Sequence, residues 1–206
     1  MQRIVLFIAI ASAAGLLIWM LLFWDPVTQE GHVALDPEIS NEPTGGDFSL
    51  TSYRGRVSLS DYHGKIVLLY IGYTWCPDIC PTNLAMISST LSVLSDAERE
   101  QVQPLFVSVD PDRDTPQRLK EYVEYFHPSM LGLTGSRNEL DDIVERYGAA
   151  YRIVKKQEDE NYVVDHSADT YIIDRQGKLV RRMAHGSGIE EMLGALRPLL
   201  QENLSR

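Results

Sequence analysis

A continuous apolar run leads directly into both cysteines of this chain. The run Ile66–Ile71 is rich in β-branched and large apolar residues, as expected of a central strand buried on both faces. The two cysteines in the sequence, Cys76 and Cys80, follow shortly after it, and a helical pattern begins at Thr82. Both thiols therefore lie where a strand ends and a helix starts. This placement predicts that the two cysteines act together, as a redox pair, as metal ligands or as a structural disulfide.

Strand-like and helix-like segments alternate over the rest of the chain. The expected strands are 48–51, 57–59, 66–71, 105–109, 131–133, 151–154, 162–164, 170–173 and 179–183. The expected helices are 82–94, 116–126, 136–147 and 188–200. Such alternation indicates a three-layer α/β domain. A cysteine pair after the first long strand and a β-hairpin near the end predict a thioredoxin-like fold, with a central mixed sheet flanked by helices.

Local signals mark several helix ends. Pro116 stands where the first helical residue is expected, because a proline there wastes no backbone N–H. Ser136 and Glu139 have the spacing of a capping box, and Gly148 is placed to end that helix. These signals predict one helix beginning near Pro116 and a second helix between Ser136 and Gly148.

The first part of the chain has the pattern of a membrane anchor. Ile4–Trp24 carries no charge, and a helix of that length spans about 30 Å, the thickness of a bilayer core. Arg3 precedes the run and acidic residues follow it, so the positive-inside rule places the N-terminus in the cytoplasm. We expect an anchor at 1–24, a flexible tether at 25–47 and the folded domain at 48–206. The competing interpretation is a cleaved signal peptide, with Ala11–Ala13 as the cleavage site.

This arrangement predicts a single-pass protein of the inner (cytoplasmic) membrane, with its soluble domain on the periplasmic side. The formal net charge of the chain is −10. An acidic balance argues against a nucleic-acid partner and against binding to anionic lipid surfaces.

The cysteine spacing permits two kinds of chemistry. A helix start favours a thiolate at Cys76, and Pro77 suits the first helical position. On a helix, Cys76 and Cys80 share a face with Cα atoms about 6 Å apart, which allows a disulfide and also allows two sulfurs to converge on one metal ion. Thioredoxin-like redox motifs have two residues between their cysteines. This pair has three, so it matches the redox pattern less well.

Two thiolates usually need a third ligand to hold a metal. Two thiolates and an imidazole suit Cu(I), further oxygen or nitrogen donors suit Cu(II), and zinc is also compatible. The candidates are the five histidines His32, His63, His127, His166 and His185. In a thioredoxin fold the loop before the final hairpin faces the start of the cysteine-bearing helix, and here that segment carries His166. Its placement favours His166 as the third ligand.

Four motifs, taken together and in this order, resemble those of the Sco/SenC family. They are Cys76–Pro81, Val109–Pro116, Leu131–Gly135 and Val164–Ser167. The resemblance covers the chain from about Phe48 to its C-terminus, together with the single N-terminal anchor. The family is similar to thioredoxins in fold. Its members bind copper through two cysteines and one histidine, and help to assemble the binuclear copper centre of cytochrome c oxidase subunit II.

By motif match, the resemblance implies copper ligation by Cys76, Cys80 and His166. It also implies an auxiliary aspartate near the site, which falls on Asp110. One departure is Asn83, where many members have glutamate; it lies outside the ligand set, and we expect little consequence.

Asp78 is a second auxiliary candidate. Either aspartate has a structural alternative, because Asp78 could stabilise the helix start and Asp110 could occupy a turn before a proline.

The leading hypothesis is a membrane-anchored copper metallochaperone that passes Cu(I) or Cu(II) to subunit II by ligand exchange, without enzymatic turnover. The alternative is a thiol–disulfide oxidoreductase, in which Cys76 and Cys80 reduce the cysteines of that subunit before the metal arrives. A further partner would be another copper donor protein or a thiol reductant. A peroxidase of the peroxiredoxin type shares the fold and needs a nearby threonine, for which Thr74 is a candidate, but the pairing of Cys76 and Cys80 with His166 argues against it.

Overall fold

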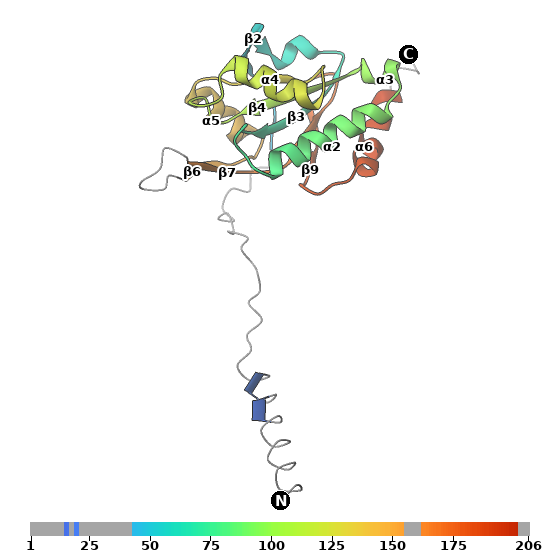
Figure 1. Ribbon diagram of the computed structural model, residues 1–206. Helices are drawn as coiled ribbons and strands as arrows, with labels where there is room; N and C mark the ends of the chain where they lie inside the picture. Colours follow the sequence, from blue (N-terminus) through green and yellow to red (C-terminus); the bar gives the residue numbers. More distant parts are fainter. Residues whose placement is uncertain (1–14, 17–18, 21–42, 155–161, 202–206) are drawn as a thin grey trace, which may run out of the picture. The chain divides into compact units, whose positions relative to one another are not determined.

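The computed structural model describes residues 15–16, 19–20, 43–154 and 162–201 (Figure 1). The chain divides into two units, Met1–Ser40 and Asn41–Arg206. In the first unit the described residues are helical. Within the described ranges, no helix has both the length and the hydropathy needed to cross a membrane. The predicted anchor at 1–24 and tether at 25–47 fall mainly outside the described residues and stay predictions.

The second unit is built on a mixed five-stranded sheet with the order β5-β4-β3-β8-β9. Its strands are β3 (Ile66–Gly72), β4 (Val102–Ser108), β5 (Leu131–Leu133), β8 (Thr170–Ile173) and β9 (Leu179–Met183). β3 pairs in parallel with β4 and antiparallel with β8, so the strand that leads to the cysteines lies in the middle. Every residue of β3 is buried, which explains its unbroken apolar pattern. The predicted thioredoxin-like α/β fold with a central mixed sheet is confirmed.

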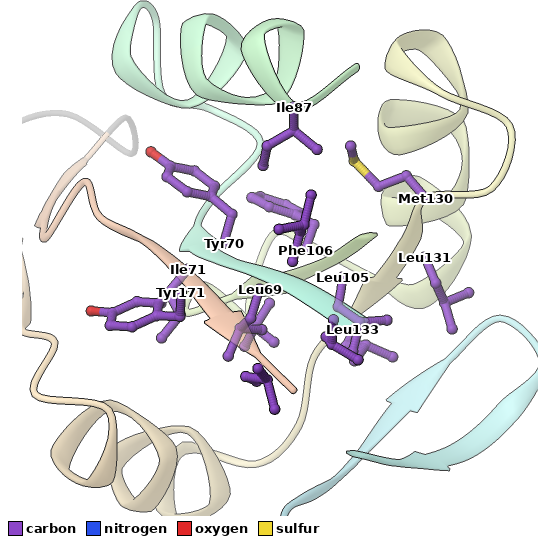
Figure 2. Packing of buried hydrophobic residues seen from close by; sticks show 14 of the residues in the cluster. Leu69, Tyr70, Ile71, Ile87, Leu105, Phe106, Met130, Leu131, Leu133 and Tyr171 are labelled. Atoms are coloured by element: carbon purple, nitrogen blue, oxygen red, sulfur yellow. The ribbon is translucent and has the colours of Figure 1, made fainter. Parts of the chain in front are cut away.

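Helices cover both faces of this sheet. They are η1 (Leu59–Tyr62, a 3-10 helix), α2 (Ile79–Val93), α3 (Asp96–Arg99), α4 (Pro116–Phe126), α5 (Arg137–Arg146) and α6 (Ile189–Gln201). On one face, Tyr70 and Phe106 point toward Ile87 of α2 (Figure 2), and α6 lies beside α2 (Figure 1). On the other face, Tyr171 contacts Tyr147 at the end of α5. Successive side chains of β3 therefore meet different helices, as the period of a strand requires.

The predicted helix ends are confirmed where local signals mark them. Pro116 is the first residue of α4, and the Thr115 hydroxyl caps that helix by accepting from the Arg118 N–H. Ser136 and Glu139 form the capping box of α5. Gly148 follows α5 with a φ of +61°, the left-handed conformation that a glycine adopts without steric cost.

Two antiparallel strand pairs stand apart from the main sheet. They are β1 (Ser49–Ser52) with β2 (Gly55–Ser58), and β6 (Tyr151–Val154) with β7 (Val163–His166). The prediction placed His166 in a loop, but it is the last residue of β7 and pairs with Tyr151. The β6–β7 pair continues the strand pattern up to His166, and the connection to β8 begins only after it.

The packing of α4 against β5 gives a test of the fold. A Cβ atom on Gly132 would lie 2.7 Å from Leu119 Cβ and 3.2 Å from the Leu119 backbone, so neither neighbour is the flexible end of a side chain. We predict that Gly132→Ala lowers the free energy of unfolding by about 1–3 kcal/mol, because the helix must move away from the sheet. Urea unfolding of the purified domain measures the change.

Gly194→Ala is the matched control. Gly194 lies inside α6 with open space around its Cα, so an added methyl meets nothing within 4 Å. Alanine is the better helix former, and this variant should raise the free energy of unfolding by about 0.5–1 kcal/mol. Equal effects of the two substitutions would contradict the close approach of α4 to β5.

Candidate metal centre

Cys76, Cys80 and His166 come together in the structure. One donor atom from each, the two Sγ atoms and a ring nitrogen, lies within 4.8 Å of the others. Cys80 Sγ is 3.3 Å from His166 Nε2, although the two residues are 86 positions apart in the sequence. Atoms that share one ion through bonds of about 2.0–2.3 Å lie roughly 3–4.6 Å apart. The three donors are thus already near the separations that a single metal ion needs.

Helix α2 begins between the two positions that the sequence analysis gave, Pro77 for the first helical residue and Thr82 for the start of the apolar pattern. It starts at Ile79, so Cys76 and Pro77 lie in the turn before it and only Cys80 is on the helix. Pro81 explains the difference. A helix starting at Pro77 would need the missing N–H of Pro81, whereas a helix starting at Ile79 keeps Pro81 in the first turn, where N–H groups have no partner within the helix. The prediction that Pro77 occupies the first helical position is wrong.

The later start still lets the helix act on Cys76. The backbone N–H of Cys80 donates to Cys76 Sγ over 3.4 Å, so one free N–H at the helix start is directed at this sulfur. Cys76 is partly exposed, and its neighbours Trp75 and Pro77 are exposed. Cys76 is therefore the thiol that a molecule from outside can reach.

Cys80, in contrast, is fully buried against the end of β3. The Tyr70 hydroxyl donates to Cys80 Sγ over 3.9 Å. A Cβ atom on Gly72 would lie 2.5 Å from that sulfur and 3.2 Å from the rings of Tyr70 and Phe106. Only glycine at this position leaves room for the thiol. The sequence analysis missed Gly72, whose signal was a glycine at the end of an otherwise large apolar strand.

His166 is oriented by its own neighbours. Its ring Nδ1 donates to the Ser167 carbonyl over 2.8 Å, which directs Nε2 toward the thiols. The Tyr73 ring meets the imidazole edge-on with 5.6 Å between centroids. A backbone carbonyl bonded to the far ring nitrogen is the usual outer support of a histidine that ligates a metal.

The two thiols have opposite proton affinities. The pKa of Cys76 falls to about 3, first because the Cys80 thiol donates to its sulfur. The His166 ring and the backbone N–H groups of Cys80 and Asp78 also lower this pKa, whereas burial raises it. Burial raises the pKa of Cys80 far above its ordinary value. The reduced, metal-free centre thus holds one thiolate, on Cys76, and one thiol, on Cys80.

A buried carboxylate fixes the turn that carries Cys76. Asp114 accepts from the Thr74 backbone N–H over 2.8 Å and from the hydroxyls of Thr74 and Ser108 over 2.5 Å each. Arg118 Nε donates to the Thr74 hydroxyl over 2.8 Å. In the sequence Asp114 resembles an acid at the start of a helix, and nothing local reveals that it reaches back to Thr74.

The two auxiliary aspartates lie outside the group of three ligands. Asp78 is the N-cap of α2 without a capping side-chain hydrogen bond, and its exposed carboxylate accepts from Thr82 over 3.4 Å. Asp110 is completely buried and accepts from Arg113 and from the Tyr162 hydroxyl over 2.5 Å each. The carboxylate of Asp110 is therefore paired with Arg113 and Tyr162 and lies outside the ligand group.

Asn83 is more involved than its place outside the ligand set suggested. Its buried amide donates to the Ile79 carbonyl over 2.9 Å and to the Tyr70 hydroxyl over 3.3 Å, and it lies 2.8 Å from His185 Nδ1. Because Tyr70 in turn donates to Cys80, Asn83 belongs to the support of the buried thiol. The sequence offered no signal for this contact.

The donor set decides which metals fit. Among the residues that the structure describes, Cys76, Cys80 and His166 form a group whose donor atoms are close enough to hold one metal ion. Two sulfurs and one imidazole suit a soft ion such as Cu(I). Three protein ligands also leave one side of the ion open, which a purely structural zinc site does not.

The pKa of Cys76 gives a test in the reduced, metal-free protein. Alkylation requires the thiolate, and the pKa of about 3 keeps Cys76 ionised throughout the range from pH 5 to 8. Its rate of reaction with iodoacetamide should stay nearly level there, whereas an ordinary thiol with a pKa of about 8.5 gains roughly tenfold per pH unit. Peptide mass spectrometry follows each cysteine separately, and Cys80 should stay protected. The protein unfolded in urea is the control, and a tenfold rise per pH unit in the folded protein would contradict the lowered pKa.

Comparisons with known proteins agree with this geometry. The family model of SCO1/SenC matches residues 36–201. A SCO2-like protein of Rickettsia conorii is 39% identical over 159 residues, which cover 76% of this chain and 77% of that protein. The structure of Arabidopsis thaliana ScoI with copper bound has a TM-score of 0.69 and 36% identity, covering 77% of this chain and 99% of that chain.

A third likeness concerns the fold alone. The structure of BsSco, described with a disulfide switch and as a member of the Sco family of cytochrome c oxidase assembly proteins, is 24% identical with a TM-score of 0.60. It covers 78% of this chain and 95% of that chain. The matched family model and the identity to the Rickettsia protein settle the relationship. The chain belongs to the SCO1/SenC family.

Proposed function

We propose that this protein is a copper metallochaperone of cytochrome c oxidase assembly, which binds copper through Cys76, Cys80 and His166. The observation that carries the proposal is the convergence of two sulfurs and an imidazole nitrogen within 4.8 Å. Its support is the copper bound to a 36% identical relative and the motif resemblance to a family that serves the oxidase. The acceptor in this proposal is the binuclear copper centre of subunit II.

The unequal exposure of the ligands indicates how copper is passed on. Cys80 is buried and Cys76 is partly exposed, so an incoming thiolate reaches the metal from the side of Cys76. The three ligands leave room for this fourth one, and copper changes partner when the bond to Cys76 breaks as the new bond forms. The oxidation state of the metal does not change. The step is an exchange of ligands and consumes no other reagent.

The proposal includes an anchor. The uncharged run Ile4–Trp24 after Arg3 would hold the protein in the inner membrane with its folded domain in the periplasm. Fractionation of cells that express the full chain, with reporter fusions at either end, tests this placement. Recovery of the intact chain in the soluble fraction would refute the anchor.

The second candidate function is a thiol–disulfide oxidoreductase, which the low pKa and the partial exposure of Cys76 favour. The Cys76 thiolate would attack a partner disulfide and release one partner thiolate, leaving a mixed disulfide. Cys80 would then lose its proton and attack the Cys76 sulfur, which releases the second partner thiolate. The products are the Cys76–Cys80 disulfide and a reduced partner.

Removal of the imidazole tests the copper proposal. We predict that the reduced wild-type domain binds about one Cu(I) and that His166→Ala weakens binding by more than the roughly 10–100-fold that loss of an outer-shell partner costs. Competition titration with a chromophoric Cu(I) chelator measures both affinities. His63→Ala changes an exposed histidine outside the ligand group and serves as the matched control. Unchanged affinity in His166→Ala would show that the ligand assignment is wrong.

The oxidoreductase candidate makes a different prediction. With an oxidised two-cysteine peptide as the probe, Cys80→Ser should accumulate a mixed disulfide at Cys76, because no second thiol is left to resolve it. His166→Ala should still reduce the peptide, since neither step forms a bond to the imidazole and the larger cause of the low Cys76 pKa, the Cys80 thiol, is kept. Gel shift and mass spectrometry detect the adduct. If no mixed disulfide forms with Cys80→Ser, this function is excluded for such partners.

A further inference from the structure

The third copper ligand lies on an accessory element. Cys80 is fixed by α2 and by the central strand β3, but His166 ends β7, which pairs only with β6 and not with the five-stranded sheet. The backbone ladder of the main sheet therefore cannot hold the imidazole in place. Side-chain contacts between the β6–β7 pair and the rest of the domain must supply that restraint.

The alternation of β7 shows where these contacts are. Successive side chains of a strand point to opposite faces, so Tyr162, Val164 and His166 share one face. Val164 is buried, whereas Val163 and Asp165 between them are exposed. The face that carries the ligand is thus also the face that Tyr162 and Val164 hold against the domain.

Tyr162 is held by a buried ion pair. Its hydroxyl donates to Asp110 over 2.5 Å, and the other oxygen of Asp110 accepts from Arg113 Nε over 2.5 Å. Arg113 Nη1 donates to the Tyr162 backbone carbonyl over 2.8 Å, and its guanidinium lies 3.6 Å from the centre of the Tyr162 ring. Both the side chain and the backbone of Tyr162 are therefore fixed to the segment that follows β4.

The same guanidinium reaches the segment that leads to Cys76. Arg113 Cζ lies 5.8 Å from the Tyr73 ring centre and 5.5 Å from the Trp75 ring centre. Tyr73 meets the His166 ring edge-on at 5.6 Å. One cation thus lies between the cysteine-bearing loop and the start of the histidine-bearing strand, within the range of cation–π attraction to all three rings.

Burial distinguishes this ion pair from the ion pair that lies on the β6–β7 hairpin. The side chains of Asp110 and Arg113 are 0% and 16% exposed, whereas those of Arg152 and Asp165 across β6 and β7 are 68% and 57% exposed. Truncating one partner of a buried ion pair leaves an uncompensated buried charge and strongly destabilises the fold around it, whereas an exposed ion pair contributes little to stability. The buried pair contacts the start of β7 through Tyr162, whereas the exposed pair lies on the hairpin itself.

We propose that Asp110, Arg113 and Tyr162, here named the Arg113 clasp, are positioning residues for His166. The clasp fixes the face and register of β7 so that the imidazole meets the two sulfurs. This inference rests on the proposed copper function, because its consequence is the affinity of that site. It gives Asp110 a role that does not involve contact with the metal. It also adds Arg113, which lies in the motif Val109–Pro116 without an assigned role, and Tyr162, which lies outside the four motifs.

A double-mutant cycle tests the clasp. Arg113→Ala should weaken Cu(I) binding by about 10–100-fold, the range expected for an outer support of a ligand. In the His166→Ala background the same change should have no further effect, because Arg113 acts through the imidazole. Arg152→Ala, which removes the exposed pair on the same hairpin, should leave the affinity unchanged. Circular dichroism and urea unfolding check that each variant is folded.

Two further measurements separate positioning from a general loss of structure. In the metal-free protein, amide hydrogen exchange at Val164 and His166 should accelerate at least tenfold in Arg113→Ala, while exchange in β3 stays unchanged. In the Cu(II)-loaded protein, nitrogen coupling in the electron paramagnetic resonance spectrum should diminish. Tyr162→Phe, which keeps the ring over Arg113 but loses the bond to Asp110, should shift the same readouts in the same direction by a smaller factor.

The outcomes are distinguishable from a failure of the proposed function. Equal effects of Arg113→Ala with and without His166, or unchanged exchange at Val164 and His166, would overturn the clasp even if copper binds. If the wild-type domain binds no copper, the proposed function fails. The clasp is then tested by hydrogen exchange alone: faster exchange at Val164 and His166 in metal-free Arg113→Ala supports it, and unchanged exchange refutes it. If Arg113→Ala does not fold, the same measurements on Tyr162→Phe test the clasp by the same criteria.

Discussion

The contact between the buried thiol of Cys80 and the bare Cα of Gly72 is the constraint on which the rest of the centre depends. β3 is fixed on both sides, by β4 and by β8, and is buried along its whole length. The absence of a Cβ at Gly72 lets the first turn of α2 approach the end of that strand. The Cys80 sulfur is consequently packed against the central, fully buried strand of the sheet. The turn that carries Cys76 and the strand that carries His166 are arranged around this fixed atom.

From that arrangement follows a difference between the two cysteines. Burial keeps the Cys80 sulfur protonated, while N–H groups at the helix start and the Cys80 thiol itself stabilise a thiolate on Cys76. One sulfur is thus anchored and neutral, and the other is charged and accessible. This difference serves both candidate functions, because an exposed thiolate is the point of entry for a metal as well as for a disulfide. The imidazole distinguishes the two functions, because it is a ligand in copper binding, whereas in sulfur exchange it forms no bond and only helps to lower the pKa of Cys76.

Sequence patterns revealed the parts of this protein whose causes are local. The strand Ile66–Ile71, the capping box at Ser136 and the final hairpin follow from periodicity and turn chemistry, and the structure has all three. Pro77 was placed at the first helical position because the constraint from Pro81 was not considered, whereas the apolar pattern from Thr82 missed the first turn of α2. Asp114 and Asn83 were not identified as supports, because their partners lie far away in the sequence and only the fold brings them into contact.

The distant origin of the third ligand has a physical consequence. Cys76 and Cys80 are four positions apart and are brought together by the turn before α2 and the first residues of that helix, whereas His166 lies 86 positions after Cys80. The ordering of such a distant residue is opposed by chain entropy, and it persists only if other contacts repay that cost. A hairpin outside the main sheet has few backbone hydrogen bonds to the domain, and local opening begins at such elements. The contacts of Asp110, Arg113 and Tyr162 offset this entropy loss close to the ligand. The Arg113 guanidinium can therefore affect copper affinity without contacting the metal. By the same reasoning, the imidazole is the ligand whose attachment depends most on side-chain contacts, whereas Cys80 is held by α2 and the central strand.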